Sequence, residues 1–209
     1  MNYEGYFNSN YALLNKNYTK WFWKQNRAVS SFFTHSPSES ILEIGSGVGG
    51  YCEFLPSGVQ YTGLELDPLA CEYTKNKYPH FSFENSSFEN FSSSRKYDVI
   101  VALEVLEHIE NPNACIKKIS NLLTEGGIFI GTSPFPFKKN VKADSTHLSV
   151  LHPQNWRRLF ELNGMKIIAI KPMTFIPAIW RINKRLNLLI PFYIPFRGII
   201  STSLLIVKK

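Results

Sequence analysis

The chain has 209 residues, of which 44% are hydrophobic and 14% aromatic, and this is enough to form one well-packed domain. No stretch approaches the roughly 18 consecutive apolar residues of a membrane-spanning helix. The first residues, MNYEGYFNSNY, lack the basic end and apolar core of a signal peptide. Three cysteines (Cys52, Cys71 and Cys115) lie far apart and form no C-x-x-C pair, so we expect a reduced, cytoplasmic protein without structural zinc.

The net charge of +7 is concentrated in the last quarter of the sequence. Up to Glu161 there are 15 Lys and Arg residues and 16 Asp and Glu residues, whereas residues 162–209 hold eight basic residues and no acidic one. This asymmetry predicts either a surface that meets an anionic partner or a basic surface that maintains solubility.

Strands and helices alternate along the chain after an aromatic-rich helix at residues 11–33. Short apolar runs predict buried strands, and Pro or Gly residues mark the ends of the helices between them. Asp67 and His152, each followed by Pro, stand at predicted helix starts. We expect strands at residues 41–45, 59–66, 81–83, 97–103, 127–133, 165–170 and 199–207. We expect helices at residues 52–55, 112–123 and 153–162, and a further helix that begins at residue 68.

This alternation predicts an α/β fold with a Rossmann-like, doubly wound sheet. Ligands of such sheets lie beyond the carboxyl ends of the strands, so Gly45, Glu65, Glu104 and Ser133 are expected around one cleft. We expect a single domain. Its parts are an N-terminal helical cap (1–35), a cofactor-binding core (36–171), an insertion that is a candidate acceptor lid (172–198) and a last strand (199–209).

The stretch ILEIGSGVGG, residues 41–50, permits two interpretations. With Gly50 it forms the G-x-G-x-x-G pattern of a dinucleotide site. With Glu43 it forms E-x-G-x-G-x-G, in which a carboxylate precedes the turn. That carboxylate would repel a pyrophosphate but attract the ammonium and sulfonium groups of S-adenosylmethionine, so Glu43 favours the latter cofactor. Glu65, which ends the second strand, would accept ribose hydroxyls under either interpretation.

Four ordered motifs, ILEIGSGVGGY, YTGLELDP, YDVIVALEVLEHI and LLTEGGIFIGTSP, resemble those of class I S-adenosylmethionine-dependent methyltransferases. The resemblance covers about residues 21–170. It implies a seven-stranded sheet, mostly parallel, with an antiparallel last strand. It also implies which residues contact the cofactor. Glu43, Gly45 and Gly47 would line the methionine end, and Glu65 would bind the ribose. Leu66 would pack on the adenine, and Leu103 and Glu104 would border the transferred methyl group.

Two regions depart from the family pattern or permit more than one interpretation. Many relatives place an Asp after the third strand to bind the adenine, whereas this chain reads FENSSFENF, so Ser86 and Phe88 become the candidate adenine contacts. The early KWFWKQNR, with Trp21, Trp23 and Arg27, resembles an aromatic helix that covers the cofactor in some relatives. The alternative is an amphipathic helix that buries its aromatic side chains in the core.

The motif EVLEH gathers Glu104, Glu107 and His108, and a later T-H supplies His147. This pair of motifs resembles the ubiquinone-pathway O-methyltransferases and, over a shorter span, the small-RNA 2′-O-methyltransferases, which hold magnesium on such ligands. One hypothesis places Mg²⁺ on all four residues. Another makes His147 or His108, together with Glu107, the catalytic acid–base group without a metal. In a third, His108 only caps a turn. His35 and His80 have no acidic or aromatic company that singles them out.

Residues 172–198 combine prolines, aromatic residues and four basic residues. They are interpreted as an acceptor lid, a dimer contact or a basic patch for an anionic membrane surface. The chain is too short for an appended RNA-binding module, which argues against nucleic acid as a partner. The leading hypothesis is a cytoplasmic methyltransferase, monomer or homodimer, that acts on a hydroxyl oxygen of a small molecule. The alternatives are a lipid-linked or saccharide acceptor at a membrane and a non-catalytic binding protein.

Overall fold

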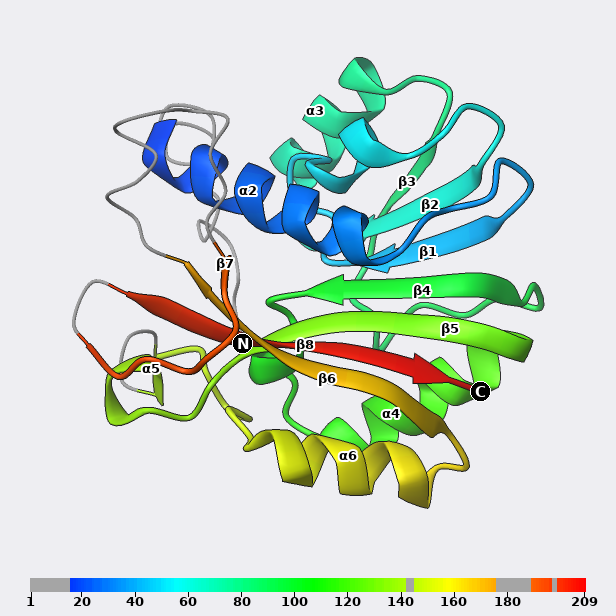
Figure 1. The fold of residues 1–209 in the computed structure, drawn as a ribbon. Helices are drawn as coiled ribbons and strands as arrows, with labels where there is room; N and C mark the ends of the chain where they lie inside the picture. The colour runs from blue at the N-terminus through cyan, green and yellow to red at the C-terminus, as the bar shows by residue number, and fades with distance from the viewer. Residues whose placement is uncertain (1–15, 142–144, 176–188, 197–198) are drawn as a thin grey trace. The chain divides into compact units, whose positions relative to one another are not determined.

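The computed structural model of the protein describes residues 16–141, 145–175, 189–196 and 199–209 (Figure 1). It consists of two compact units, Met1–Val99 and Ile100–Lys209, which are considered separately below. Helices and strands alternate along the chain, and the predicted α/β class is confirmed.

The first unit contains three parallel strands. β1 (Ser40–Ile44) pairs with β2 (Gln60–Glu65), and β2 pairs with β3 (Ser82–Asn85). All five residues of β1 are buried, as expected for a parallel strand covered on both faces. The unit also holds the helices α2 (Lys16–Phe32), η1 (Tyr51–Phe54) and α3 (Pro68–Lys77).

The start of α3 follows the sequence-based expectation. Asp67 Oδ1 accepts hydrogen bonds from the amides of Leu69 (2.8 Å) and Ala70 (3.2 Å), and Pro68 occupies the first turn. These bonds satisfy amides that have no partner within the helix. Asp67 is therefore an N-cap, as predicted, and it fixes the point at which the chain leaves β2.

The strand β4 (Tyr97–Leu103) begins in the first unit and ends in the second. The second unit then contains η2 (Leu106–His108), α4 (Pro112–Leu122), β5 (Leu123–Pro134), α5 (Lys138–Val141), α6 (Pro153–Leu162), β6 (Lys166–Phe175), β7 (Leu189–Ile190) and β8 (Ile200–Lys208). β8 is antiparallel to both β5 and β6, which confirms the predicted antiparallel last strand. Figure 1 shows α4 and α6 along one face of these strands.

Three expectations about the strands were wrong, namely their number and two of their boundaries. The described residues contain eight strands rather than seven, because the short β7 pairs with the end of β6. β6 continues to Phe175, so residues 172–175 of the expected insertion are part of a strand. β5 begins at Leu123 rather than at the predicted residue 127. Residues 11–15 of the predicted first helix and residues 176–188 lie outside the described residues.

Helix α6 supplies a test of the packing in the second unit. Phe160 is fully buried, and its ring lies 5.2 Å from that of Phe129, whereas Leu162 on the same helix is 68% exposed. We expect Phe160→Ala to lower the free energy of unfolding by about 3–5 kcal/mol, since it leaves a cavity. Leu162→Ala should change it by less than about 0.5 kcal/mol. Urea denaturation followed by circular dichroism measures both, and equal effects would contradict this packing.

Candidate active site

The turn after β1 uses its glycines for two different purposes. Gly47 has φ +54°, and a Cβ added there would meet nothing within 4 Å, so the backbone is open for the approach of a ligand. Gly50 has φ −64°, and a Cβ added there would lie 2.6 Å from the side-chain nitrogen of Asn26 on α2. Gly50 thus has a packing role, and the G-x-G-x-x-G pattern needs no pyrophosphate to explain it.

Glu65 links the end of β2 to this turn. Its side chain is buried, Oε2 accepts the Gly47 amide (2.7 Å) and Oε1 accepts the Asp67 amide (2.9 Å). Burial raises the pKa of this carboxyl, and the two amides act in the opposite direction. Each carboxylate oxygen keeps a further lone pair, so Glu65 can still accept hydrogen bonds from a ligand diol.

Glu43 lies on β1, is 3% exposed and accepts a hydrogen bond from the Tyr61 hydroxyl on β2. Burial raises its pKa to about 8, the Tyr61 hydrogen bond lowers it, and neighbouring Glu65 raises it further. The carboxyl is therefore mainly protonated at neutral pH in this structure. Sequence reasoning treated it as a charged carboxylate because the desolvation was not visible in the motif.

The residues expected near the adenine follow β2 and β3. Leu66 is 43% exposed, whereas Phe88 is buried, and the Ser86 amide donates to the Glu65 carbonyl (3.1 Å). The side-chain amide of Asn85 donates to the carbonyls of Glu65 (2.9 Å) and Leu66 (2.8 Å). Asn85 was missed by the sequence analysis, although it stands in the FENSSFENF stretch, and it fixes the backbone that presents Leu66.

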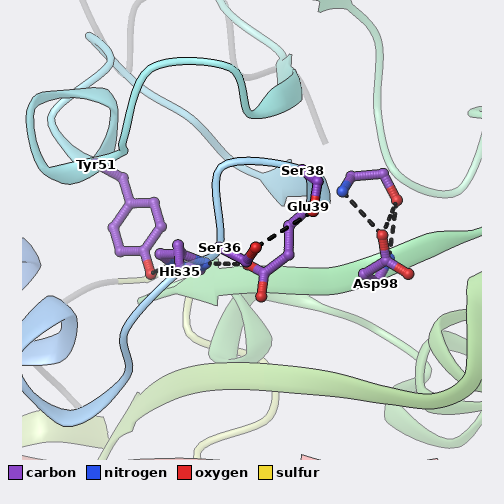
Figure 2. Close-up of polar contacts among 7 residues, drawn as sticks. His35, Ser36, Ser38, Glu39, Tyr51 and Asp98 are labelled. Atoms are coloured by element: carbon purple, nitrogen blue, oxygen red, sulfur yellow. Dashed lines mark hydrogen bonds and ion pairs between the residues drawn. The ribbon is translucent and has the colours of Figure 1, made fainter.

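A buried chain of side chains supports the glycine turn within the first unit (Figure 2). His35 Nδ1 lies 2.8 Å from Glu39 Oε2, and His35 Nε2 lies 2.7 Å from the hydroxyl of Tyr51, the residue after Gly50. A carboxylate only accepts, so Nδ1–H donates to Glu39 and Nε2 accepts from Tyr51. The expectation that no acidic or aromatic company singles out His35 was wrong, because folding brings both Glu39, four residues along the chain, and Tyr51, sixteen residues along it, to the ring.

The end of β4 holds Glu104 in a strained conformation. Its φ of 54° is left-handed, which costs on the order of 1–2 kcal/mol for a residue other than glycine. Its amide donates to Thr132 Oγ1 (2.9 Å), and its Oε1 accepts from Thr202 Oγ1 (2.8 Å). Both threonines are fully buried. Strain of this kind is concentrated at functional sites. Leu103, the preceding residue, is 6% exposed.

Among the described residues, Glu107, His108 and His147 form one acid–histidine cluster, with one ligand atom from each lying within 4.8 Å of the others. His147 Nδ1 lies 2.8 Å from the Asn140 carbonyl, so it carries the proton and leaves the Nε2 lone pair available. His108 Nδ1 lies 3.2 Å from the Thr146 carbonyl and 2.9 Å from the Thr146 hydroxyl.

Backbone hydrogen bonds bring His147 to this cluster. The carbonyl of Glu107 accepts the amides of Leu148 and Ser149, both at 2.8 Å, and the Ser149 hydroxyl donates to the Ile109 carbonyl (2.7 Å). Three of the four predicted metal or acid–base residues are thus brought together. Glu104 is not part of the cluster, since its carboxylate accepts from Thr202 instead.

A family model described as a methyltransferase domain matches residues 18–170. The chain belongs to this methyltransferase family. It is 31% identical over 106 residues to the ubiquinone biosynthesis O-methyltransferase of Glaesserella parasuis, with 45% of each chain aligned. It is 26% identical over 200 residues to the mitochondrial ubiquinone biosynthesis O-methyltransferase of Dictyostelium discoideum, with 78% of this chain and 62% of that one aligned.

The fold is also found among solved structures. An S-adenosylmethionine-dependent methyltransferase from Mesorhizobium loti superposes with a TM-score of 0.66 at 13% identity, over 88% of this chain and 96% of that one. The chain spans only 45% and 62% of the length of the two ubiquinone-pathway relatives. The chain thus contains a methyltransferase domain with a Rossmann-like fold, as the sequence motifs indicated.

Several sequence-based hypotheses concern residues that the structure does not describe. The acceptor lid falls largely on residues 176–188, and the side chains of Trp21 and Trp23 are outside the described part of α2. No helix in the described part of the chain combines the length and apolar character needed to cross a membrane. His152, in contrast, is the N-cap of α6 as predicted, because its Nδ1 accepts the Gln154 amide (3.3 Å).

Glu43 gives a prediction about stability and pH. The pKa of Glu43 is about 8 in the folded protein, and its ordinary value is 4.5. Between pH 4.5 and pH 8, the folded state therefore holds a proton that the unfolded state has lost. The contribution of Glu43 to the free energy of unfolding is thus complete below pH 4.5. It falls by on the order of 3–5 kcal/mol as pH rises to 8. Glu43→Gln should remove this decline. Urea unfolding at several pH values measures it, and a difference between the two proteins that stays constant with pH would contradict it.

Proposed function

We propose that the protein transfers the methyl group of S-adenosylmethionine to a hydroxyl oxygen of a small-molecule acceptor. The observation that carries this proposal is the acid–histidine cluster, in which His147 has its Nδ1 proton directed to the Asn140 carbonyl at 2.8 Å. A hydroxyl acceptor needs a base, whereas a neutral amine does not. The ubiquinone-pathway O-methyltransferases among the relatives support oxygen as the acceptor atom.

The first unit offers groups that fit the methyl donor. Glu65 would accept the ribose hydroxyls with the lone pairs left by its two amide bonds, and the open backbone at Gly47 would lie against the methionine end, with Gly45 beside it. Glu43 would balance the positive charge of that end, since a nearby cation lowers the pKa of a buried carboxyl. When bound, S-adenosylmethionine supplies a methyl group on a sulfonium that a nucleophile can displace in line.

The second unit offers the groups that would prepare the acceptor. His147 Nε2 would take the hydroxyl proton, and the acceptor oxygen would form its bond to the methyl carbon as the bond from carbon to sulfur breaks. His108 would lie beside this base, with ring centroids 5.0 Å apart. The buried Glu107 would favour the imidazolium that results. General base catalysis of this kind contributes about 10²–10⁴-fold to a rate.

The same cluster also suits a divalent metal, as the alternative hypothesis for these residues. Its ligands would be Glu107, His108 and His147, without Glu104. Two imidazoles and one carboxylate match Zn²⁺, Mn²⁺ or Fe²⁺ better than Mg²⁺, which prefers oxygen ligands. Both histidines direct Nδ1 to oxygen atoms, the arrangement that orients metal-binding imidazoles. A bound metal would lower the pKa of the acceptor hydroxyl.

The base hypothesis predicts a selective loss of rate. In His147→Gln, kcat towards a panel of catechols and phenols, assayed with radiolabelled S-adenosylmethionine, should fall about 10²–10⁴-fold. The dissociation constant of S-adenosylmethionine, measured by calorimetry, should stay unchanged. The exposed His80 provides the control, because His80→Gln should retain full activity. Failure of the wild-type protein to bind S-adenosylmethionine, or label transferred to nitrogen only, would contradict the proposal.

The metal and the base hypotheses differ in their response to chelation. If His147 acts without a metal, EDTA should leave kcat unchanged. If the cluster holds a metal, EDTA should abolish activity and Zn²⁺ or Mn²⁺ should restore it. Elemental analysis of the purified protein and of Glu107→Gln decides between them, since replacing a ligand of a metal site should lower the amount of metal that the protein retains.

A further inference from the structure

The glycine turn, residues 45–50, has few side chains with which to hold its own conformation. It reads Gly-Ser-Gly-Val-Gly-Gly, and Gly45, Gly47 and Gly49 have φ values of 71°, 54° and 73°. Glycine loses more conformational freedom on folding than any other residue, so a turn of this composition needs restraint from outside. Tyr51 is the first aromatic residue after the turn, and its side chain is fully buried.

Backbone hydrogen bonds restrain the first part of the turn. The Gly47 amide donates to Glu65 on β2 (2.7 Å), and the Gly49 amide donates to the Ser46 carbonyl (2.9 Å). Both bonds act before the turn ends and η1 begins at Tyr51. The hydroxyl of Tyr51 supplies a polar anchor at that end.

His35 accepts the hydrogen bond of this anchor. Its Nε2 lies 2.7 Å from the Tyr51 hydroxyl, and its Nδ1 lies 2.8 Å from Glu39 Oε2 (Figure 2). Burial raises the pKa of Tyr51, so this hydroxyl keeps its proton and serves as the donor. The His35 side chain is 2% exposed, and the Phe33 ring lies against it with centroids 5.0 Å apart. The imidazole is thus fixed in orientation, with its Nε2 lone pair directed to Tyr51.

The bond between His35 and Tyr51 joins the segment before β1 to the residue after the turn. It closes residues 35–51, which contain both β1 and the glycine turn, into one loop. Without this bond, the far end of the turn would be held by packing alone. A ligand that requires one conformation of the turn would then have to order it on binding, which lowers affinity.

We propose that His35 is a positioning residue for S-adenosylmethionine, acting through the Tyr51 hydroxyl to hold the glycine turn in the conformation that receives the methionine end. This inference rests on the proposed function, in which the open backbone at Gly47 lies against that end of the donor. His35 acts on the turn and not on the reacting atoms. Its loss should therefore raise the KM for the donor and leave kcat at saturating donor unchanged.

Three variants of the full chain isolate the hydrogen bond. They are Tyr51→Phe, His35→Phe and the double variant. In each, the dissociation constant of S-adenosylmethionine, measured by calorimetry, should rise about 3–10-fold, the value of one hydrogen bond. The double variant should lose no more than either single one, because all three lack the same interaction.

Stability and affinity should respond differently in these variants. Each single variant leaves a buried polar group without its partner, whereas the double variant removes both groups. Urea unfolding should therefore show a loss of stability in the single variants that the double variant largely recovers. The affinity for the donor should not recover, because the turn still lacks its anchor. This difference separates a positioning role from a merely structural one.

Hydrogen exchange tests the turn in the protein without ligand. The amides of Gly47 and Gly49 should exchange about 3–10-fold faster in the double variant, while the amides of β1 keep their wild-type rates. Tyr73→Phe is the matched control. Tyr73 lies on α3, with its ring 5.8 Å from Lys77 Nζ, so this variant should match the wild type in affinity and exchange.

Two results would overturn the inference and leave the proposed function intact. One is wild-type donor affinity and wild-type exchange of the turn amides in Tyr51→Phe and in the double variant. The other is a donor affinity that recovers together with stability in the double variant, since His35 would then serve folding alone. A wild-type protein that does not bind S-adenosylmethionine would overturn both the proposed function and this role of His35.

Discussion

The burial of carboxyl groups is the constraint on which the site residues depend. Glu43, Glu65 and Glu107 are each less than 5% exposed, and a buried carboxyl is costly unless it is hydrogen bonded or protonated. Glu65 and Glu43 meet this requirement through neighbouring groups. Glu65 requires the turn amides of Gly47 and Asp67, and Glu43 requires Tyr61 and keeps a proton. The glycine turn, the start of α3 and the end of β2 are therefore set by the same few hydrogen bonds.

Strand β8 meets a similar constraint with hydroxyl groups. Its Ser201, Thr202 and Ser203 are buried, and successive side chains of a strand point to opposite faces. The single hydroxyl proton of Thr202 faces both Glu104 Oε1 (2.8 Å) and the Ser133 carbonyl (2.7 Å), whereas the hydroxyls of Ser201 and Ser203 contact the Ile194 amide and the Tyr193 hydroxyl. Three adjacent polar residues thus hold the strained Glu104 on one face and residues 193–194 on the other. This explains why a strand of the core contains Ser-Thr-Ser.

Local signals predicted most of the fold. Apolar runs located the strands, and Pro68, Pro112 and Pro153 located the starts of α3, α4 and α6, because proline and capping residues act within one turn of the helix. Strand ends were less accurate. The pairing of β6 with β7 and β8, which extends β6 to Phe175, is a tertiary effect with no local signal.

The site was predicted where its residues are close in sequence and missed where they are distant. Glu107 and His108 were apparent from one motif, and His147 from a second. Thr202 binds Glu104 from 98 residues away, and Asn85 reaches Glu65 and Leu66 from about 20 residues away. His35 shows a different limit, because its partner Glu39 is only four residues away. Its neighbours Glu39 and Tyr51 are ordinary in the sequence, and only folding makes them partners.

The preference for a cationic cofactor at the glycine stretch was based on an incomplete description of Glu43. Glu43 was taken as a fixed negative charge that selects a cationic cofactor, and the chain does belong to a methyltransferase family. The structure instead gives a carboxyl that burial keeps largely protonated near neutral pH. A group with a pKa near 8 can lose its proton when a cation approaches and regain it when the cation leaves. Its buried position therefore makes Glu43 a charge that a cationic ligand would itself induce. A pyrophosphate would meet a neutral carboxyl rather than a fixed negative charge, so Glu43 discriminates through the attraction of a cation and not through the repulsion of an anion.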